Sequence, residues 1–284
     1  MKTSPTGSVS APASEPGKWQ VGTLSYTAFG LAALMFWLFW GDVAWALRER
    51  SVPSVMQLLF QKFGATNLVS GLLISTLPNA MILLVGPFIS YRSDRHRGRW
   101  GRRIPFLAGH IPFAVLSVFA VAFSPQLGGG LHSLLGSHAP SLESCILIVV
   151  AAGWGIFELA TVVANAVFYG LINDVVPSTL LGRFYGIFRA ISLSASILFN
   201  WYVFGTAEKH FPLVFIGIGI VYGVSFGMMC LRVKEGSYPP PAEPKEGGGN
   251  FFAAVRTYFR ECFSKPYYLW VFAAIALPWI SFIG

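Results

Sequence analysis

Long apolar segments alternate with short polar ones along most of the chain. A membrane-spanning helix needs about 20 mainly apolar residues, because each residue adds about 1.5 Å and the hydrocarbon layer is about 30 Å thick. The pattern predicts six complete spans, over residues 21–47, 68–89, 104–124, 145–173, 185–206 and 212–231. A seventh apolar segment begins near Tyr268 and continues to Gly284.

The polar segments complete the predicted domain organisation. Residues 1–20 are rich in Ser, Pro, Gly and Ala, a composition typical of a disordered tail. Residues 232–267 begin as a Pro/Gly/Glu/Lys-rich linker. Within them, residues 250–263 would form a helix with one apolar and one charged face, as an interfacial amphipathic helix does. Residues 21–231 form the six-helix bundle, and 268–284 begin a seventh span. We expect the chain to be the first half of a longer protein, whose second half is needed for function.

Composition indicates lipid as the solvent of this chain. Hydrophobic residues make up 54% of it and charged residues only 11%, with a mean hydropathy of +0.60. A soluble domain carries about 25% charged residues, so this chain lacks the usual polar coat. We therefore expect an all-α, multi-pass integral membrane protein in contact with the bilayer.

The basic residues predict how the chain is oriented. With the N-terminus inside, fifteen of the 20 Lys and Arg residues lie on the cytoplasmic side, and one, Arg189, lies within a span. The outer connections then hold four: Arg48, Arg50, Lys62 and Lys209. This bias predicts a cytoplasmic N-terminus in an inner or plasma membrane. Residues 92–103, hereafter the arginine turn, are too tightly tethered between two spans to bind nucleic acid.

The arginine turn also carries a recognisable motif. The segment SDRHRGRWGRRIPF (93–106) fits the cytoplasmic signature of the major facilitator superfamily through Asp94, Arg95, Gly101, Arg102 and Arg103. Its form DRxRxRWGRRxPF is similar to that of the glycoside–pentoside–hexuronide:cation symporters and the related sucrose symporters. The segment LINDVVPSTLLGRFYGIFR (171–189) resembles the connection between spans four and five of the same group. The resemblance implies a major-facilitator-type six-helix bundle in which spans one, two, four and five line a solute path.

Charges at the ends of the spans predict a cytoplasmic gate. Arg95, Arg102 and Arg103 can bridge Asp94 to acidic groups on neighbouring spans, and Asp174 at the end of span four is the obvious candidate. Such pairs can hold a gate closed and break when the two halves of a transporter rock. The alternative is that most of these arginines only fix topology and touch lipid phosphates.

Span four carries a carboxylate near its predicted midpoint, Glu158. Ionisable groups at this depth are costly and usually face a cavity or a partner. We expect Glu158 to line a polar cavity and to take up and release a proton, or else to pair structurally with another span. Its helical face also carries Trp154, Thr161, Asn165 and Tyr169.

Two further charges are candidates. Arg189 shares a stripe of span five with Tyr185, Ser192, Ser196 and Asn200, although it can also snorkel to the interface. Asp42 falls near the outer exit of span one, among Trp37, Trp40 and Trp45. Aromatic rings beside a carboxylate suit a sugar, and they equally suit an interfacial tryptophan belt.

The resemblance adds a substrate and a coupling ion. Sucrose symporters place an acidic residue in span four, sixteen residues before another at its cytoplasmic end, and Glu158 and Asp174 reproduce that spacing. Span two lacks the sodium-site aspartates of melibiose-type symporters, which favours protons over sodium. We expect a transporter of a small polar solute, a sugar or glycoside. The alternatives are an exporter, a carrier of another metabolite, or a non-transporting member of the fold that serves assembly.

The sequence contains no motif that is typical of an enzyme. It contains no serine elbow, glycine-rich phosphate loop or metal-binding cluster of Cys and His. We expect neither an enzyme nor a bound metal or cofactor.

Overall fold

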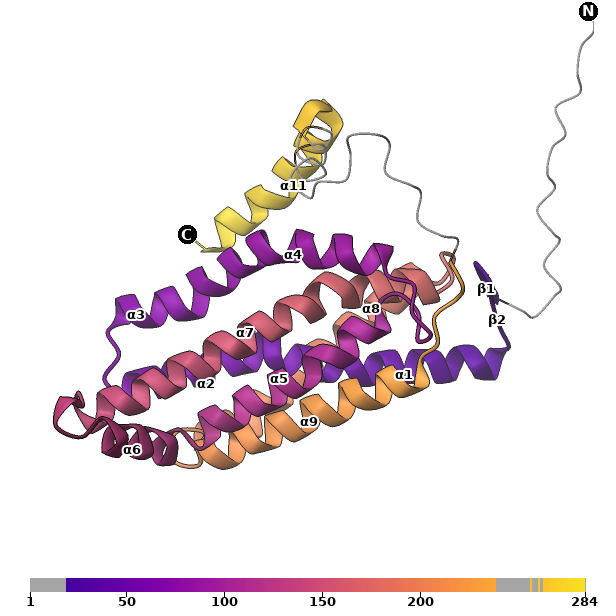
Figure 1. Ribbon diagram of the computed structural model, residues 1–284. Coiled ribbons are helices and arrows are strands. Elements are labelled where there is room, and N and C mark those ends of the chain that lie inside the picture. Colours follow the sequence, from indigo (N-terminus) through magenta and orange to yellow (C-terminus); the bar gives the residue numbers. More distant parts are fainter. Residues whose placement is uncertain (1–18, 239–255, 257–259, 261–262, 284) are drawn as a thin grey trace, which may run out of the picture. The chain divides into compact units, whose positions relative to one another are not determined.

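A computed structural model describes residues 19–238, 256, 260 and 263–283, which belong to two compact units, Met1–Tyr238 and Pro239–Gly284. Helices dominate both units (Figure 1). The first unit starts with a two-stranded hairpin, β1 (Trp19–Val21) and β2 (Leu24–Tyr26). Its α-helices are α1 (Ala28–Ala46), α2 (Val52–Lys62), α3 (Asn67–Gly71), α4 (Leu77–Arg95), α5 (Ile104–Ala122), α6 (Ser124–Leu135), α7 (Leu142–Val175), α8 (Leu181–Tyr202) and α9 (Phe211–Arg232). Short 3₁₀ turns, η3 (Gly136–His138) and η4 (Phe204–Thr206), and two π-helical turns complete it.

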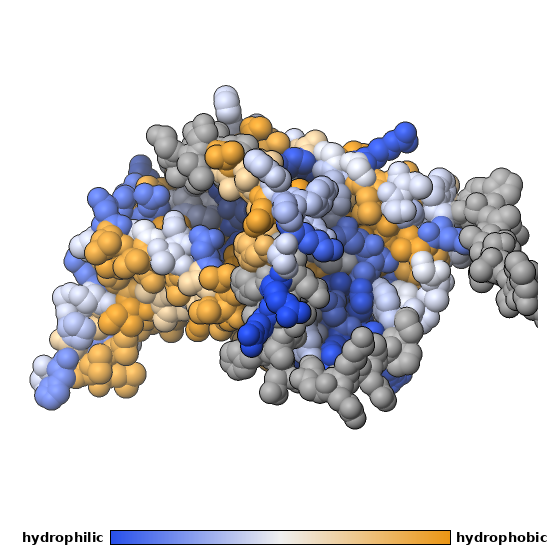
Figure 2. Space-filling view, turned by 90° about the horizontal axis from the view of Figure 1, so that it is seen from above, coloured by the Kyte–Doolittle hydropathy of each residue, from blue (hydrophilic) through white to orange (hydrophobic). Residues whose placement is uncertain are grey.

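Six helical segments among the described residues are long and apolar enough to cross a membrane. Their apolar side chains cover broad areas of the molecular surface (Figure 2), as lipid-facing helices require. The predicted all-helical, multi-pass membrane protein is therefore confirmed at this level. The segments are Ala28–Lys62, Asn67–Arg95, Ile104–Ala122, Leu142–Val175, Leu181–Thr206 and Phe211–Arg232.

The first span begins later than the apolar pattern predicts. Residues before it pair as an antiparallel hairpin, which turns at Gly22 with φ +56°. Thr27 then caps α1 by accepting a hydrogen bond from the Gly30 amide at 3.2 Å. The span therefore starts at Ala28 rather than at residue 21.

The first span also continues well past Leu47, so the prediction that Arg48 and Arg50 lie in an outer connection is wrong. Both occupy a π-helical turn, η1 (Leu47–Ser51), that joins α1 to α2 in one run of 35 residues. Pro53 follows this turn, and the wider turn accommodates the missing amide and bulky ring of a proline. The same device recurs in the second span, where η2 (Leu72–Thr76) precedes Pro78.

Close helix packing builds the core of the first unit. Helix α5 packs along both α7 and α9, and α1 packs against α8 and α9 (Figure 1). Gly219 of α9 lies directly against Phe119, since an added Cβ would come within 2.6 Å of its ring. Gly223 faces Val115 in the same way, whereas a Cβ added at Gly227 would meet no atom of the described residues within 4 Å. Small residues let membrane helices approach closely, so two of these three glycines set the α5–α9 contact.

Some predicted segments fall beyond the described part of the chain. Most of the tail over 1–20, most of the linker over 232–267 and most of the interfacial helix over 250–263 lie outside the described residues. In the second unit, helix α11 (Pro266–Ile283) covers the predicted start of a seventh span.

Gly219 and Gly227 provide a matched test of this packing. We expect Gly219→Ala to lower the unfolding free energy by about 1–3 kcal/mol, because the new methyl group overpacks the contact with Phe119. Gly227→Ala should be neutral or slightly stabilising, because alanine favours helix and the site is open. Thermal unfolding of the detergent-solubilised protein measures both, and equal midpoints for the two variants would contradict the packing.

Candidate functional site

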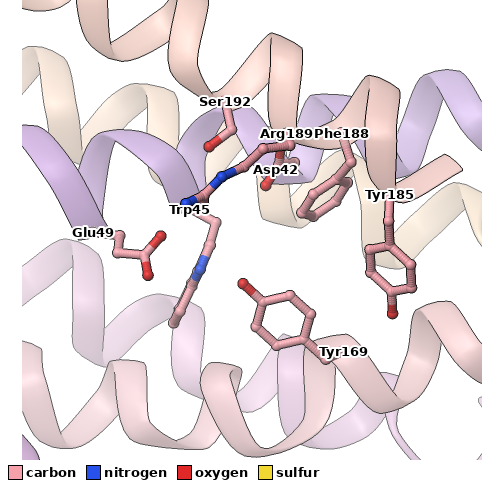
Figure 3. A pocket seen from close by; sticks show the side chains of 8 residues that line it. All are labelled: Asp42, Trp45, Glu49, Tyr169, Tyr185, Phe188, Arg189 and Ser192. Atoms are coloured by element: carbon pink, nitrogen blue, oxygen red, sulfur yellow. The ribbon is translucent and has the colours of Figure 1, made fainter. Parts of the chain in front are cut away.

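A cavity of about 270 Å³ opens between the first, fourth and fifth spans. Aromatic and ionisable side chains line it together (Figure 3). Its lining residues are Asp42, Trp45 and Glu49 from the first span, Tyr169 from α7, and Tyr185, Phe188, Arg189 and Ser192 from α8. Elements far apart in sequence thus bring acidic, basic and aromatic groups to one place.

Asp42 is the most unusual group in this cavity. It lies fourteen residues after Ala28, or about 21 Å along a straight helix, and not near the end of the span as predicted. Its side chain is buried, yet neither carboxylate oxygen has a hydrogen-bond partner among the described residues. The charges of Glu49, Arg189 and Arg50 act on it. An unpartnered carboxylate at this depth is costly unless it takes up a proton or meets a ligand.

Aromatic rings form much of the remaining wall. Trp45 and Tyr169 meet edge to face with their ring centroids 6.4 Å apart, and the ring centroids of Tyr169 and Phe188 are also 6.4 Å apart. The Tyr169 hydroxyl points into the space between the helices, as Figure 3 shows. The Tyr185 hydroxyl points away from it and donates to Asn173 Oδ1 at 3.0 Å. The cavity therefore presents flat apolar faces next to a few polar groups.

Glu158, which we expected to line a polar cavity, does not line this one. Its side chain is only 2% exposed and forms an ion pair with Arg48 of η1. The pair lies close enough to Tyr222 of α9 for both charges to act on that residue, whose hydroxyl is 2.9 Å from His110 Nε2. The alternative reading, a structural carboxylate paired with another span, describes this geometry.

Only some of the residues predicted to line the solute path lie at the cavity. The Trp154 indole donates to the Leu73 carbonyl in the second span at 2.9 Å, and the Thr161 hydroxyl donates within its own helix to the Glu158 carbonyl at 2.9 Å. Asn165 is half-buried, and Asn200 bonds within its own helix to the Ser196 carbonyl at 2.9 Å. None of these four lines the cavity. Of the predicted pathway residues, the structure brings Asp42, Tyr169 and Arg189 together.

Sequence reasoning missed Glu49 because the first span was ended too early. Asp42, Trp45 and Glu49 follow the spacing i, i+3, i+7, which places them on one face of a continuous helix. Extending the helix through the charged residues 48–50 would have revealed that face.

A second polar cluster lies where the arginine turn meets the end of α7. Arg102 Nη2 approaches Asp174 Oδ1 at 2.7 Å, and Arg103 Nε approaches Asp174 Oδ2 at 2.5 Å. Arg103 also reaches Asp94 at 3.0 Å. Gly170 makes room, because an added Cβ would collide with the Arg103 guanidinium. Asp94, Arg102, Arg103 and Asp174, hereafter the arginine cluster, thus join the second, third and fourth spans.

The other predicted gate residues have different surroundings. Arg95 stacks on the Tyr91 ring at 4.5 Å and forms no ion pair with the carboxylates of the described residues. Gly101 adopts φ +100°, a conformation that favours glycine. Burial lowers the pKa of Arg102, but the hydrogen bond and charge of Asp174 outweigh it and raise that pKa overall. The Arg102 guanidinium therefore stays charged.

Comparisons with known proteins add no family or fold assignment. No protein-family model matches the chain, and no solved structure matches it. Within the described residues, no group of three or more His, Cys, Asp and Glu side chains could hold a metal ion. Structure and composition thus define the class, a multi-pass helical membrane protein with a mixed aromatic and ionisable cavity.

The Arg48–Glu158 pair is expected to be structural. Glu158→Ala should lower the unfolding free energy by about 3–5 kcal/mol, because it leaves the largely buried guanidinium of Arg48, only 12% exposed, unpaired. The double variant Arg48→Met/Glu158→Leu should recover most of that loss, since it removes both charges. Chemical unfolding in detergent measures both variants. A double variant as unstable as the single one would show that the pair is not the cause.

Proposed function

We propose that the chain forms part of a secondary active transporter of the major facilitator type. It moves a small polar solute, a sugar or glycoside, coupled to protons by alternating access. One observation carries the proposal: a cavity between the first, fourth and fifth spans contains a buried carboxylate, Asp42, without a hydrogen-bond partner among the described residues. Intramembrane ionisable groups of this kind are costly and mark transport pathways more often than packing sites.

The wall of the cavity supports a sugar as solute. The rings of Trp45, Tyr169 and Phe188 offer flat faces on which the C–H face of a sugar can stack. Arg189, Ser192 and the Tyr169 hydroxyl offer hydrogen bonds for its hydroxyl groups. The cavity is close in size to the smaller ligand sites of proteins, which begin at about 300 Å³.

Asp42, rather than Glu158, is the group that we assign to proton coupling. Arg48 already neutralises Glu158 away from the cavity, so a proton there would leave the guanidinium unpaired. Asp42 has no such partner among the residues that the structure describes, and it lies beside Arg189. When Asp42 is protonated, Arg189 is free to bind solute hydroxyls; when it is ionised, the two charges attract across the cavity. This exchange links proton uptake to solute binding.

The arginine cluster supports the alternating-access part of the proposal. Asp174 binds two arginines from the turn between the second and third spans. The Asp174 side chain is 14% exposed and that of Asp94 52%, compared with 2% for Glu158, so water can solvate these carboxylates when the pairs break. A gate built in this way holds one side closed and lets it open during the cycle.

Uptake by cells that express the full-length protein tests the function. Radiolabelled disaccharides should accumulate in energised cells and not after addition of a proton uncoupler. Asp42→Asn should abolish accumulation while preserving solute exchange down a gradient, because it removes the proton site and keeps the shape. Inverted vesicles, assayed in parallel, separate import from export.

Glu143→Gln is the matched control, because Glu143 is an exposed carboxylate in the first turn of α7. It should transport at the wild-type rate. Normal proton-driven accumulation by Asp42→Asn would refute the assignment of Asp42, and an absence of any solute flux in the wild type would refute the transporter.

A further inference from the structure

Residues 233–238, hereafter the strap, follow α9 and lie against the arginine turn. Sequence reasoning assigned them to a flexible linker, yet the structure anchors them at several points. Val233 is buried, and Glu235, Gly236 and Tyr238 are half-buried. The strap therefore belongs to the six-helix unit.

Glu235 makes the strongest of these contacts. Its Oε2 accepts the Arg102 amide at 2.9 Å, and its Oε1 accepts the amides of Arg103 and Ile104 at 2.8 and 2.6 Å. The first amides of a helix lack partners within it, so a carboxylate from elsewhere both satisfies them and complements the helix dipole. Glu235 thus bonds to the main chain of both arginines that bind Asp174.

The neighbouring glycine makes this arrangement possible. A Cβ at position 101 would come within 2.6–2.9 Å of the Glu235 side chain. Gly101 therefore supplies both the left-handed backbone of the turn and the space for the carboxylate.

Two further contacts hold the strap on either side of Glu235. The Ser237 amide donates to Thr23 Oγ1 in the N-terminal hairpin at 2.9 Å. The Tyr238 ring covers the Arg102 guanidinium, with its centroid 4.2 Å from Arg102 Cζ. Burial, together with the charges of Asp174 and Glu235, raises the pKa of Tyr238 to about 12, so its phenol stays neutral beside the arginine.

We propose that Glu235 is a positioning residue for the arginine cluster, acting through the main chain of Arg102 and Arg103. The direction of a side chain follows from its backbone, so fixing both amides aims both guanidinium groups at Asp174. The strap thereby makes the gate depend on the segment that leaves the sixth span. This inference rests on the proposed function only in that the arginine cluster acts as a gate, and the positioning itself can be measured without transport.

A spin label on the turn provides that measurement. In the full-length protein, Cys145, Cys230 and Cys262 are replaced by alanine, and a nitroxide is attached to Arg99→Cys, since Arg99 is exposed on the turn. We expect an immobile spectrum in this background. Glu235→Ala should remove the immobile component, and Glu235→Gln, which keeps one acceptor oxygen, should retain part of it. Lys234→Ala, on an exposed neighbour in the strap, should leave the spectrum unchanged.

Asp174→Asn separates positioning from simple helix capping. It should leave the label immobile, because Glu235 still holds the turn. If Glu235 acts through the arginine cluster, Glu235→Gln should reduce uptake in the wild-type background and add no further loss in the Asp174→Asn background. An unchanged spectrum in both Glu235 variants would overturn the proposal. So would a double variant Glu235→Gln/Asp174→Asn whose uptake loss is the product of the losses in the two single variants. Because Glu235→Gln is isosteric, it decides the question even if Glu235→Ala does not fold. Failure of uptake in every protein would count against the transporter alone.

Discussion

A charge inside a bilayer needs a partner, and this constraint organises the first unit of the chain. Glu158 and Arg48 satisfy it directly, since each neutralises the other between the fourth and first spans. Asp42 has no hydrogen-bond partner in the described part of the chain, although it is equally buried and lies on the same helix as Arg48. The contrast separates a carboxylate that holds helices together from an unpartnered one, to which we assign proton coupling.

The same constraint acts differently at the end of the bundle where the arginine turn lies. There the carboxylates of Asp94 and Asp174 are more exposed than that of Glu158, and the main chain of their arginine partners is hydrogen-bonded to Glu235. Ion pairs at such sites are weak individually. Their geometry therefore depends on Glu235, Gly101 and Tyr238, none of which contributes a charge to the pairs with Asp174. A weak pair on a rigid support suits a contact that must open and close.

The sequence predicted those features of the fold that a single segment determines by itself. Apolar length alone located six spans, because the bilayer fixes how many residues a helix needs. Asp174 could be paired with Arg102 and Arg103 because alternate connections emerge on the same side. Contacts through the main chain left no such signal, so Glu235 was missed although it bonds to three amides. The first span was ended too early because Arg48, one of the charges that follow Leu47, finds its partner in Glu158, 110 residues away.

The protonation of Asp42 is the central claim, and infrared difference spectroscopy of the purified full-length protein measures it directly. Addition of solute should perturb the carbonyl band of a protonated carboxyl group. If Asp42 carries the proton, this band disappears in Asp42→Asn and persists in Glu158→Gln. A band that survives in Asp42→Asn and is lost in Glu158→Gln would contradict this claim, since the proton would then reside on the carboxylate paired with Arg48.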